Sequence, residues 1–280
     1  MAPRRDTRGI LDAAGLLSLV RFRRREAAEP LRRYVEHYWL IDWDLPRPYT
    51  TRVLPHPSVN LVLQRYGDAP AHGELTGIAP GVFRQRLAGT GRVCGVQFRP
   101  GGFGPFARDH PVSHWTGRRV PLPEALPGTP PAATVTGPAD EDDRVAALDA
   151  LLLGLRPEPD PDTDLAVALA ERIRTDRTLR RVADLAADAG LSVRALQRLF
   201  ARQVGVGPKW VILRHRIHEA IERAETGTAV DWAALAHELG YSDQAHLTRD
   251  FTATLGVPPT AYAGGWAPPA ASPTPRGRSG

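Results

Sequence analysis

The sequence predicts an α+β protein of two domains: a β-rich N-terminal domain with a closing helix, and an all-α C-terminal domain of two helix-turn-helix units joined by a long helix. Three observations predict this. Short β-prone runs cut by Pro and Gly fill the first half, helical periodicity fills the second, and a proline-rich stretch separates them. A length of 280 residues also exceeds the ~100–200 residues of one typical domain.

The β-rich domain is expected to span residues 31–155. Its predicted strands, where β-branched and aromatic residues are common, are 34–43, 51–54, 59–63 and 92–98. Residues 140–155 then repeat apolar side chains at helical spacing, which predicts the closing helix. Residues 1–30 hold a short apolar run among arginines and are predicted to be a disordered basic arm.

A proline-rich linker is predicted at residues 156–163, because each proline disfavours helix in the residue before it. The second domain is expected at 164–263, where Leu165 and Leu169 begin a helical pattern that continues without a strand signal. Residues 264–280 are rich in Pro, Gly, Ala and Ser and are predicted to be a disordered tail. They offer too little apolar surface to offset the entropy of ordering.

The C-terminal half contains one unit twice. Positions of the first copy recur fifty residues later, and after one inserted residue the offset becomes fifty-one. The first set pairs Thr178, Val182, Leu185, Ala186 and Gly190 with Thr228, Trp232, Leu235, Ala236 and Gly240. The second set pairs Leu196, Arg198, Phe200, Gly205, Val206 and Pro208 with Leu247, Arg249, Phe251, Gly256, Val257 and Pro259. The duplication predicts two copies of one folded unit.

Each copy contains a helix, a glycine turn and a second helix. The second helices are predicted at 193–204 and 244–255. Ser192 and Asp243 precede them as N-caps, whose side-chain oxygen accepts an unpaired backbone N–H. Apolar stripes are expected to pack on the preceding helices, which leaves the opposite faces to solvent or DNA. Solvated faces of a helical bundle are the alternative, but two capped helices in the same arrangement favour helix-turn-helix units.

The exposed faces carry Arg and Gln, whose paired donors and acceptors match guanine and adenine edges in the major groove. Seven positive charges against two negative lie between Arg194 and Arg223, whereas the second unit carries four acids against Arg249 alone. The first unit should therefore supply most of the phosphate affinity. The predicted DNA-binding residues are Ser192, Arg194, Gln197, Arg198, Arg202, Lys209, Arg214, Arg216, Gln244, Thr248 and Arg249.

Residues 165–263 resemble the DNA-binding domain of the AraC/XylS family of bacterial transcription regulators. The motifs that carry the resemblance are Leu185-Ala186, Gly190-Leu191-Ser192, Leu196 to Phe200, Gly205 to Pro208, Arg214 to Ile217, Leu235-Ala236, Gly240 to Asp243, Leu247 to Phe251, Gly256 to Pro259 and Tyr262. The resemblance implies that one helix of each unit enters successive major-groove segments, held apart by a helix at 208–224. It also implies base-reading roles for Arg194, Gln197 and Arg198, and for Gln244, Thr248 and Arg249. Ala245 departs from the family pattern, where a polar residue is common, so the second unit is expected to discriminate less.

The N-terminal half resembles a sensory-type domain often joined to this module, with no ligand implied. A small-molecule pocket could be lined by its aromatic residues, although such clusters also form cores. These residues are Tyr38, Trp39, Trp43, Phe98 and Phe103. The effector is therefore unassigned, and a dimerisation or partner-binding module without an effector is the alternative.

The sequence argues against catalysis and against a metal site. Cys94 is the only cysteine, so neither an intramolecular disulfide nor a cysteine-based zinc cluster can form, and a buried residue is expected there. The proline between His110 and His114 opposes a helix that would present both to a metal. His215 and His218 are expected to be solvated or phosphate-facing. An enzyme fused to a DNA-binding module is the less favoured alternative.

A cytoplasmic protein is expected, because no apolar run reaches the ~20 residues of a membrane span and no signal-peptide pattern is found. The expected partners are double-stranded DNA and RNA polymerase, with a small-molecule effector left open, no membrane and no cofactor. Either a monomer or a homodimer agrees with the sequence. The net charge of +5 is carried almost wholly by arginine, since Lys209 is the sole lysine.

Overall fold

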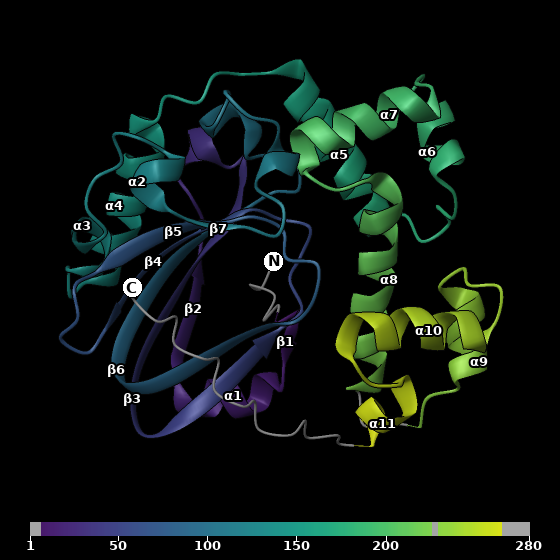
Figure 1. Cartoon of the computed structure of the whole chain (residues 1–280), viewed down its shortest axis with the longest axis horizontal. Helices are drawn as coiled ribbons and strands as arrows, with labels where there is room; N and C mark the ends of the chain where they lie inside the picture. The colour runs from purple at the N-terminus through teal and green to yellow at the C-terminus, as the bar shows by residue number, and fades with distance from the viewer. Residues whose placement is uncertain (1–6, 226–228, 265–280) are drawn as a thin grey trace, which may run out of the picture. The chain divides into compact units, whose positions relative to one another are not determined.

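The computed structural model describes residues 7–225 and 229–264 (Figure 1). The chain forms two compact units, one within Met1–Glu219 and one within Ala220–Gly280. The first holds a β-sheet, its covering helices and the first helix-turn-helix unit, and the second holds the other helix-turn-helix unit. The two compact units therefore do not divide at the predicted linker. They divide within the helix α8 (Pro208–Ala224).

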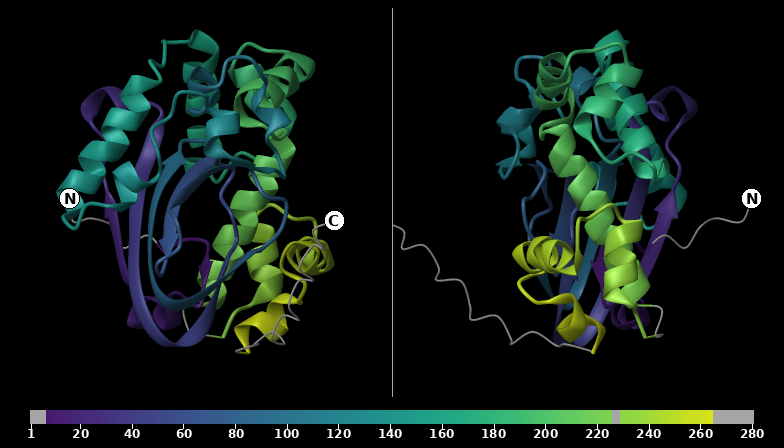
Figure 2. Two further views of the ribbon diagram at one scale, coloured as in Figure 1. Left: turned by 60° about the vertical axis from the view of Figure 1, so that its left-hand side comes forward. Right: turned by 90° about the vertical axis from the view of Figure 1, so that its right-hand side faces the viewer.

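A sheet of seven strands lies in the described N-terminal part, in the order β1-β3-β6-β4-β5-β7, with β2 also pairing with β3. The strands, all paired antiparallel, are β1 (Ile10–Leu11), β2 (Arg21–Arg25), β3 (Val35–Val53), β4 (Asn60–Tyr66), β5 (His72–Thr76), β6 (Phe83–Phe98) and β7 (Arg119–Pro121). β3 and β6 pair along nearly their whole length and curve together, as Figure 2 shows. The prediction of a β-rich N-terminal half and a helical C-terminal half is confirmed.

The strands predicted at 34–43 and 51–54 are parts of one strand, β3. Its pairing with β6 shifts in register between Leu45 and Tyr49. Two prolines lie inside that shift, where a residue without an N–H interrupts no ladder hydrogen bond. The prolines that suggested a break in the strand are therefore accommodated by an irregularity within it.

The sheet carries a separate apolar cluster on each face, because successive side chains of a strand point to opposite sides. Tyr38, Phe98 and Phe103 lie in the larger cluster, whereas Trp43 and the partly buried Trp39 lie in the other. The aromatic residues proposed to line one pocket are thus divided between two faces and do not share a cavity wall. Helices α2 (Leu122–Ala125), α3 (Ala133–Thr136) and α4 (Glu141–Gly154) lie on one side of the sheet in Figure 1.

The closing helix predicted at 140–155 is confirmed as α4. Asp140 caps it by accepting two backbone N–H groups of the first turn. Leu148 and Leu152 are completely buried in the larger apolar cluster. The helical spacing of apolar residues therefore marked the face that packs on the sheet.

The expectation of a disordered arm at residues 1–30 is wrong for residues 7–30, while residues 1–6 lie outside the described part of the chain. β1 and β2 both pair with β3, and Leu16 of α1 (Ala13–Leu19) is buried with Val20. Three arginines of β2, Arg21, Arg23 and Arg25, form ion pairs with acids of β3 and α4. The arginine-rich composition predicts disorder, but carboxylates from distant parts of the chain neutralise positive charges of β2, which is ordered.

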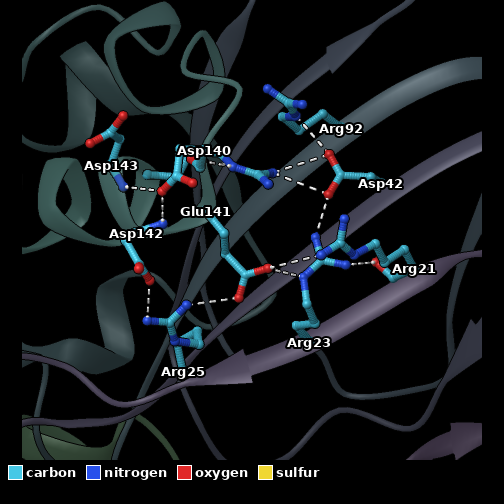
Figure 3. A network of polar contacts seen from close by, with 10 residues as sticks. Arg21, Arg23, Arg25, Asp42, Arg92, Asp140, Glu141, Asp142 and Asp143 are labelled. Atoms are coloured by element: carbon cyan, nitrogen blue, oxygen red, sulfur yellow. Dashed lines mark hydrogen bonds and ion pairs between the residues drawn. The ribbon is translucent and has the colours of Figure 1, made fainter.

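An ion-pair network joins β2, β3, β6 and α4 (Figure 3). Asp42 accepts hydrogen bonds from Arg23 at 2.6 Å, Arg92 at 2.6 Å and Arg144 at 3.1 Å. The side chain of Arg144 is only 3% exposed, so Asp42 neutralises a buried charge. Burial raises the pKa of Asp42, but hydrogen bonds from Arg92 and the nearby charge of Arg144 outweigh this and hold that pKa below its usual value. Glu141 extends the network to Arg21 and Arg25 of β2.

The C-terminal helices follow the predicted duplication. After α5 (Pro161–Thr175), the first copy contains α6 (Val182–Asp188), α7 (Val193–Leu199) and a π-helical turn η4 (Phe200–Val204). The second contains α9 (Trp232–Glu238) and α10 (Gln244–Leu255), followed by α11 (Pro259–Ala263). Both interhelical turns use glycine at positive φ, Gly190 at 66° and Gly240 at 77°. Gly205 at 97° and Gly256 at 82° end the second helices. The repeated glycines are thus positions whose backbone conformation disfavours a side chain.

α5 begins at Pro161, inside the predicted linker 156–163. Proline is favoured at the first helical position because its missing N–H has no intrahelical partner there. Asp160 caps this helix by accepting the N–H of Asp162 at 3.0 Å. The prolines that predicted a linker therefore also start a helix, and only residues 156–160 precede it.

Candidate DNA-binding interface

The first predicted reading surface lies on α7. Ser192 caps this helix as predicted, accepting the backbone N–H of Ala195 at 3.1 Å. Leu196 and Phe200 are completely buried in the apolar cluster that includes α6. Packing of that stripe leaves exposed the three residues predicted to read bases, Arg194, Gln197 and Arg198. Sequence reasoning missed Val193, whose side chain is 40% exposed at the start of the same helix.

The second predicted reading surface lies on α10. Asp243 accepts the backbone N–H of His246 at 2.7 Å, and this hydrogen bond holds the pKa of Asp243 below its usual value. Leu247 and Phe251 are buried as predicted. Gln244 and Arg249 are exposed. The remaining candidate on this helix is the half-buried Thr248.

The predicted phosphate contacts of the first unit divide into two groups. Arg202 and Lys209 are exposed, and Arg216 is half-buried with a hydrogen bond to the carbonyl of Arg180 at 3.3 Å. These side chains remain on the surface where a phosphate could reach them. Arg214 lies elsewhere.

Arg214 is buried, contrary to its predicted role as a surface phosphate contact, with only 4% of the residue exposed. Its guanidinium donates to the carbonyls of Pro55 at 3.3 Å and Pro80 at 2.6 Å and lies 4.3 Å from the centre of the Trp210 ring. Burial lowers its pKa to about 10. The basic run around α8 predicted a charged surface, but the loops of the β-rich part cover this arginine.

Two histidines of α8 lie beside Arg214. His218 is buried and His215 is half-buried, but solvent reaches the ring nitrogens of neither, which corrects the expectation of solvated or phosphate-facing rings. Both ring nitrogens of His215 and of His218 are inaccessible and have no hydrogen-bond partner among the described residues. The ring of His218 stacks on His56 at a centroid distance of 4.5 Å. Burial lowers the pKa of His215 to about 3 and that of His218 far below its usual value. The positive charges of Arg214 and Arg8 act in the same direction.

Acidification should therefore destabilise the first compact unit. A histidine whose pKa is lowered by folding adds stability that is complete above the unfolded pKa of ~6.5 and is lost as pH falls toward the folded pKa. With His215 and His218 both contributing, the free energy of unfolding should fall by about 3 kcal/mol between pH 7.5 and pH 5.5. Urea unfolding followed by tryptophan fluorescence at the two pH values measures this difference.

The control for this prediction is His218→Phe, which keeps a buried ring and removes one titrating group. It should lose about half of the pH dependence while staying folded by circular dichroism at pH 7.5. Equal stability of the unsubstituted protein at the two pH values would contradict the burial of both rings.

Polar contacts hold the η4 end of the first helix-turn-helix unit, one from the β-rich part and two from the start of α5. The hydroxyl of Thr116 donates to the carbonyl of Gly205 at 2.8 Å. Gln203, only 3% exposed, donates to Asp160 at 2.8 Å and accepts from the hydroxyl of Thr163 at 3.2 Å. Sequence reasoning missed these residues because their partners lie 89, 43 and 40 positions away along the chain. The end of the first predicted recognition helix is therefore held from the preceding domain by Thr116 and from the start of α5 by Asp160 and Thr163.

Cys94, His110 and His114 are the other side chains that the sequence singled out for possible chemistry. Cys94 is buried as expected, and burial raises the pKa of its thiol to about 11. His110 and His114 stack on each other with centroids 4.2 Å apart. Within residues 7–225 and 229–264, no group of three or more His, Cys, Asp or Glu residues is placed to hold a metal ion. None of the described helices has the length and apolar character needed to span a membrane.

Two family models match the chain. One, described as a helix-turn-helix domain, matches residues 185–264, and the other, described as a domain of unknown function (DUF6597), matches residues 23–121. Over 81 residues the chain is 38% identical to a protein of Streptomyces lividans described as an AraC-like transcription regulator. The match covers 29% of this chain and 26% of that protein, so the chain matches only about a quarter of the curated relative.

Solved structures that the chain matches include the DNA-binding domain of AdpA and the protein ToxT. The DNA-binding domain of AdpA, a global transcriptional factor crystallised with a target DNA, is 25% identical with a TM-score of 0.32, and the match covers 38% of this chain and 93% of that chain. ToxT from Vibrio cholerae is 13% identical with a TM-score of 0.39, and the match covers 81% of this chain and 96% of that chain.

Proposed function

Because residues 185–264 form a helix-turn-helix domain of the AraC type, we propose that the protein is a cytoplasmic, sequence-specific DNA-binding transcription regulator. The observation that carries this proposal is the repeat of one arrangement: a capped helix, held by a buried apolar stripe, with Arg and Gln on its exposed face. In the proposal, α7 with η4 and α10 enter successive major-groove segments.

Base reading in the first unit is assigned to Arg194, Gln197 and Arg198, because their forked donors and acceptors match guanine and adenine edges. The exposed Val193 lies beside them and is suited to contact a thymine methyl group. In the second unit the same role falls on Gln244, Thr248 and Arg249. Phosphate contacts are assigned to Ser192, Arg202, Lys209 and Arg216, while the buried Arg214 is left out.

The N-terminal domain is proposed to modulate DNA binding. The hydrogen bond from Thr116 to the carbonyl of Gly205, at the end of the first recognition helix, supports this, because a shift in the β-rich part would move η4 directly. RNA polymerase is the proposed protein partner of the DNA-bound state. A module that binds a protein partner or a second copy, without a small-molecule effector, is the alternative role for this domain.

Selection of random duplexes by the full chain tests the proposed function. We expect enrichment of one sequence motif, and loss of that enrichment in the double variant Arg194→Ala and Arg198→Ala. Arg65→Ala, which removes an exposed arginine on β4 instead, should enrich the same motif. Failure of the unsubstituted protein to enrich any motif would overturn the proposed function.

A further inference from the structure

A groove of about 820 Å³, lined by both apolar and charged side chains, runs along one flank of α7, within the first compact unit. One of its sides comes from the recognition segment, with Arg198 and Arg202. Another comes from residues 108–113 of the N-terminal domain, with Arg108 and Ser113. The groove therefore joins the predicted DNA-reading helix to a loop that no DNA-binding prediction included.

Helical spacing shows which flank this is. Residues 194, 197 and 198 lie three and four positions apart and form the predicted reading face. Residues 195, 198, 199 and 202 form the adjacent stripe, and all four line the groove. The two stripes share Arg198, so the groove begins at the edge of the reading face.

A helix in the major groove has DNA backbone along both of its sides. An α-helix with its side chains is ~10–12 Å wide, and the major groove is ~12 Å wide, so little space is left between the helix and either strand. With α7 inserted, one strand must pass along the stripe that contains Arg202. The loop of residues 108–113 lies across that path, in the same compact unit.

The charges of the groove suit a phosphate backbone. Three arginines line it, Arg108, Arg198 and Arg202, against the two carboxylates of Asp109 and Asp162. Arg108 now pairs with Glu158 at 2.7 Å, but the side chain of Glu158 is 74% exposed, so this pair is easily exchanged for a phosphate.

We infer that the N-terminal domain binds DNA directly: the backbone strand that flanks the first recognition helix lies over this groove and contacts Arg108. The inference rests on the proposed function, because it requires α7 to occupy the major groove. It extends the DNA-contacting surface beyond the helix-turn-helix domain, to a loop before the closing helix.

The salt dependence of binding to the selected duplex tests this inference. Each phosphate contact contributes about 0.9 to the slope of log K against log salt, so Arg108→Ala should lower the slope by about 0.9 and the affinity by roughly eightfold at 0.1 M salt. Glu158→Gln should act in the opposite direction and raise affinity, because it releases Arg108 and removes a negative charge beside the strand. Arg65→Ala, a matched loss of an exposed arginine outside the groove, should change neither quantity.

Two results with Arg108→Ala would overturn the inference. Unchanged affinity and slope would mean that the strand does not touch the loop, and increased affinity would mean that the loop obstructs it. Either result leaves the proposed function standing, since the duplex was selected by the unsubstituted protein. Failure to select any duplex would be a failure of the proposed function itself.

A cleavage experiment locates the contact independently of affinity. Ser113→Cys places a thiol at the exposed edge of the groove, and Cys94 is buried, so an iron–EDTA label attaches to the new thiol alone. We expect localised backbone cleavage on one strand, next to the segment bound by α7. The same label at Arg65→Cys should give no localised cleavage. Equal patterns from the two positions would overturn the inference.

Discussion

Replacing Arg198 by alanine is expected to lower affinity for the selected duplex by about 10- to 100-fold, equivalent to ~1–3 kcal/mol. Arg198 is exposed on the reading face of α7 and also lines the flanking groove, so its removal affects both base and backbone contacts. Fluorescence anisotropy with a labelled duplex measures the change. The dependence of affinity on DNA sequence should weaken most at the base pair that Arg198 contacts.

Arg249→Ala is the matched variant in the second unit and should have a smaller effect. The side chain of Arg249 already donates to the carbonyl of Ala245 at 3.3 Å, and Asp243 and Asp250 lie on or beside the same helix. These acids repel phosphates, whereas the exposed Arg202 and Lys209 of the first unit attract them. A larger loss of DNA affinity from Arg249→Ala than from Arg198→Ala would contradict the expectation that the first unit contributes more affinity than the second.

The second large effect concerns stability. Asp42→Asn should lower the free energy of unfolding by about 3 kcal/mol, because it leaves the buried charge of Arg144 without its carboxylate. The amide also turns an N–H₂ donor toward guanidinium groups that need acceptors (Figure 3). Urea unfolding at neutral pH measures the difference.

Asp142→Asn is the control for the ion-pair network. Its side chain is 78% exposed and pairs with Arg25 at 2.5 Å, so its loss should change stability by less than ~1 kcal/mol. Similar losses in the free energy of unfolding from the two variants would show that the burial of Arg144 does not determine how much its ion pair contributes.

Because the pKa of Asp42 is lowered in the folded protein, the stability that Asp42 contributes should be lost only as pH falls below ~4.

Local signals predicted the C-terminal half well. Ser192 and Asp243 cap the two recognition helices, and Gly190 and Gly240 take the positive φ that their turns require. Capping, glycine turns and apolar stripes depend on residues within a few positions of one another. A repeat in the sequence therefore specified both units without knowledge of their surroundings.

The sequence did not predict contacts between residues that lie far apart along the chain. Arg214 belongs to a basic run, yet the carbonyls of Pro55 and Pro80, more than 130 positions away, hold it in the interior. The arginines of β2 suggested a disordered arm until Asp42 and Glu141 were brought beside them by the sheet. A pattern of charges alone does not indicate which of them will be neutralised by tertiary contacts.

Hydroxyl-radical footprinting of the full chain on the selected duplex tests the central claim most directly. Two recognition helices in successive major-groove segments predict two protected regions on one face of the DNA, about 10 base pairs apart. Arg198→Ala should weaken the protection of one region more than that of the other. Protection of a single region, or of none, would contradict binding through two helix-turn-helix units.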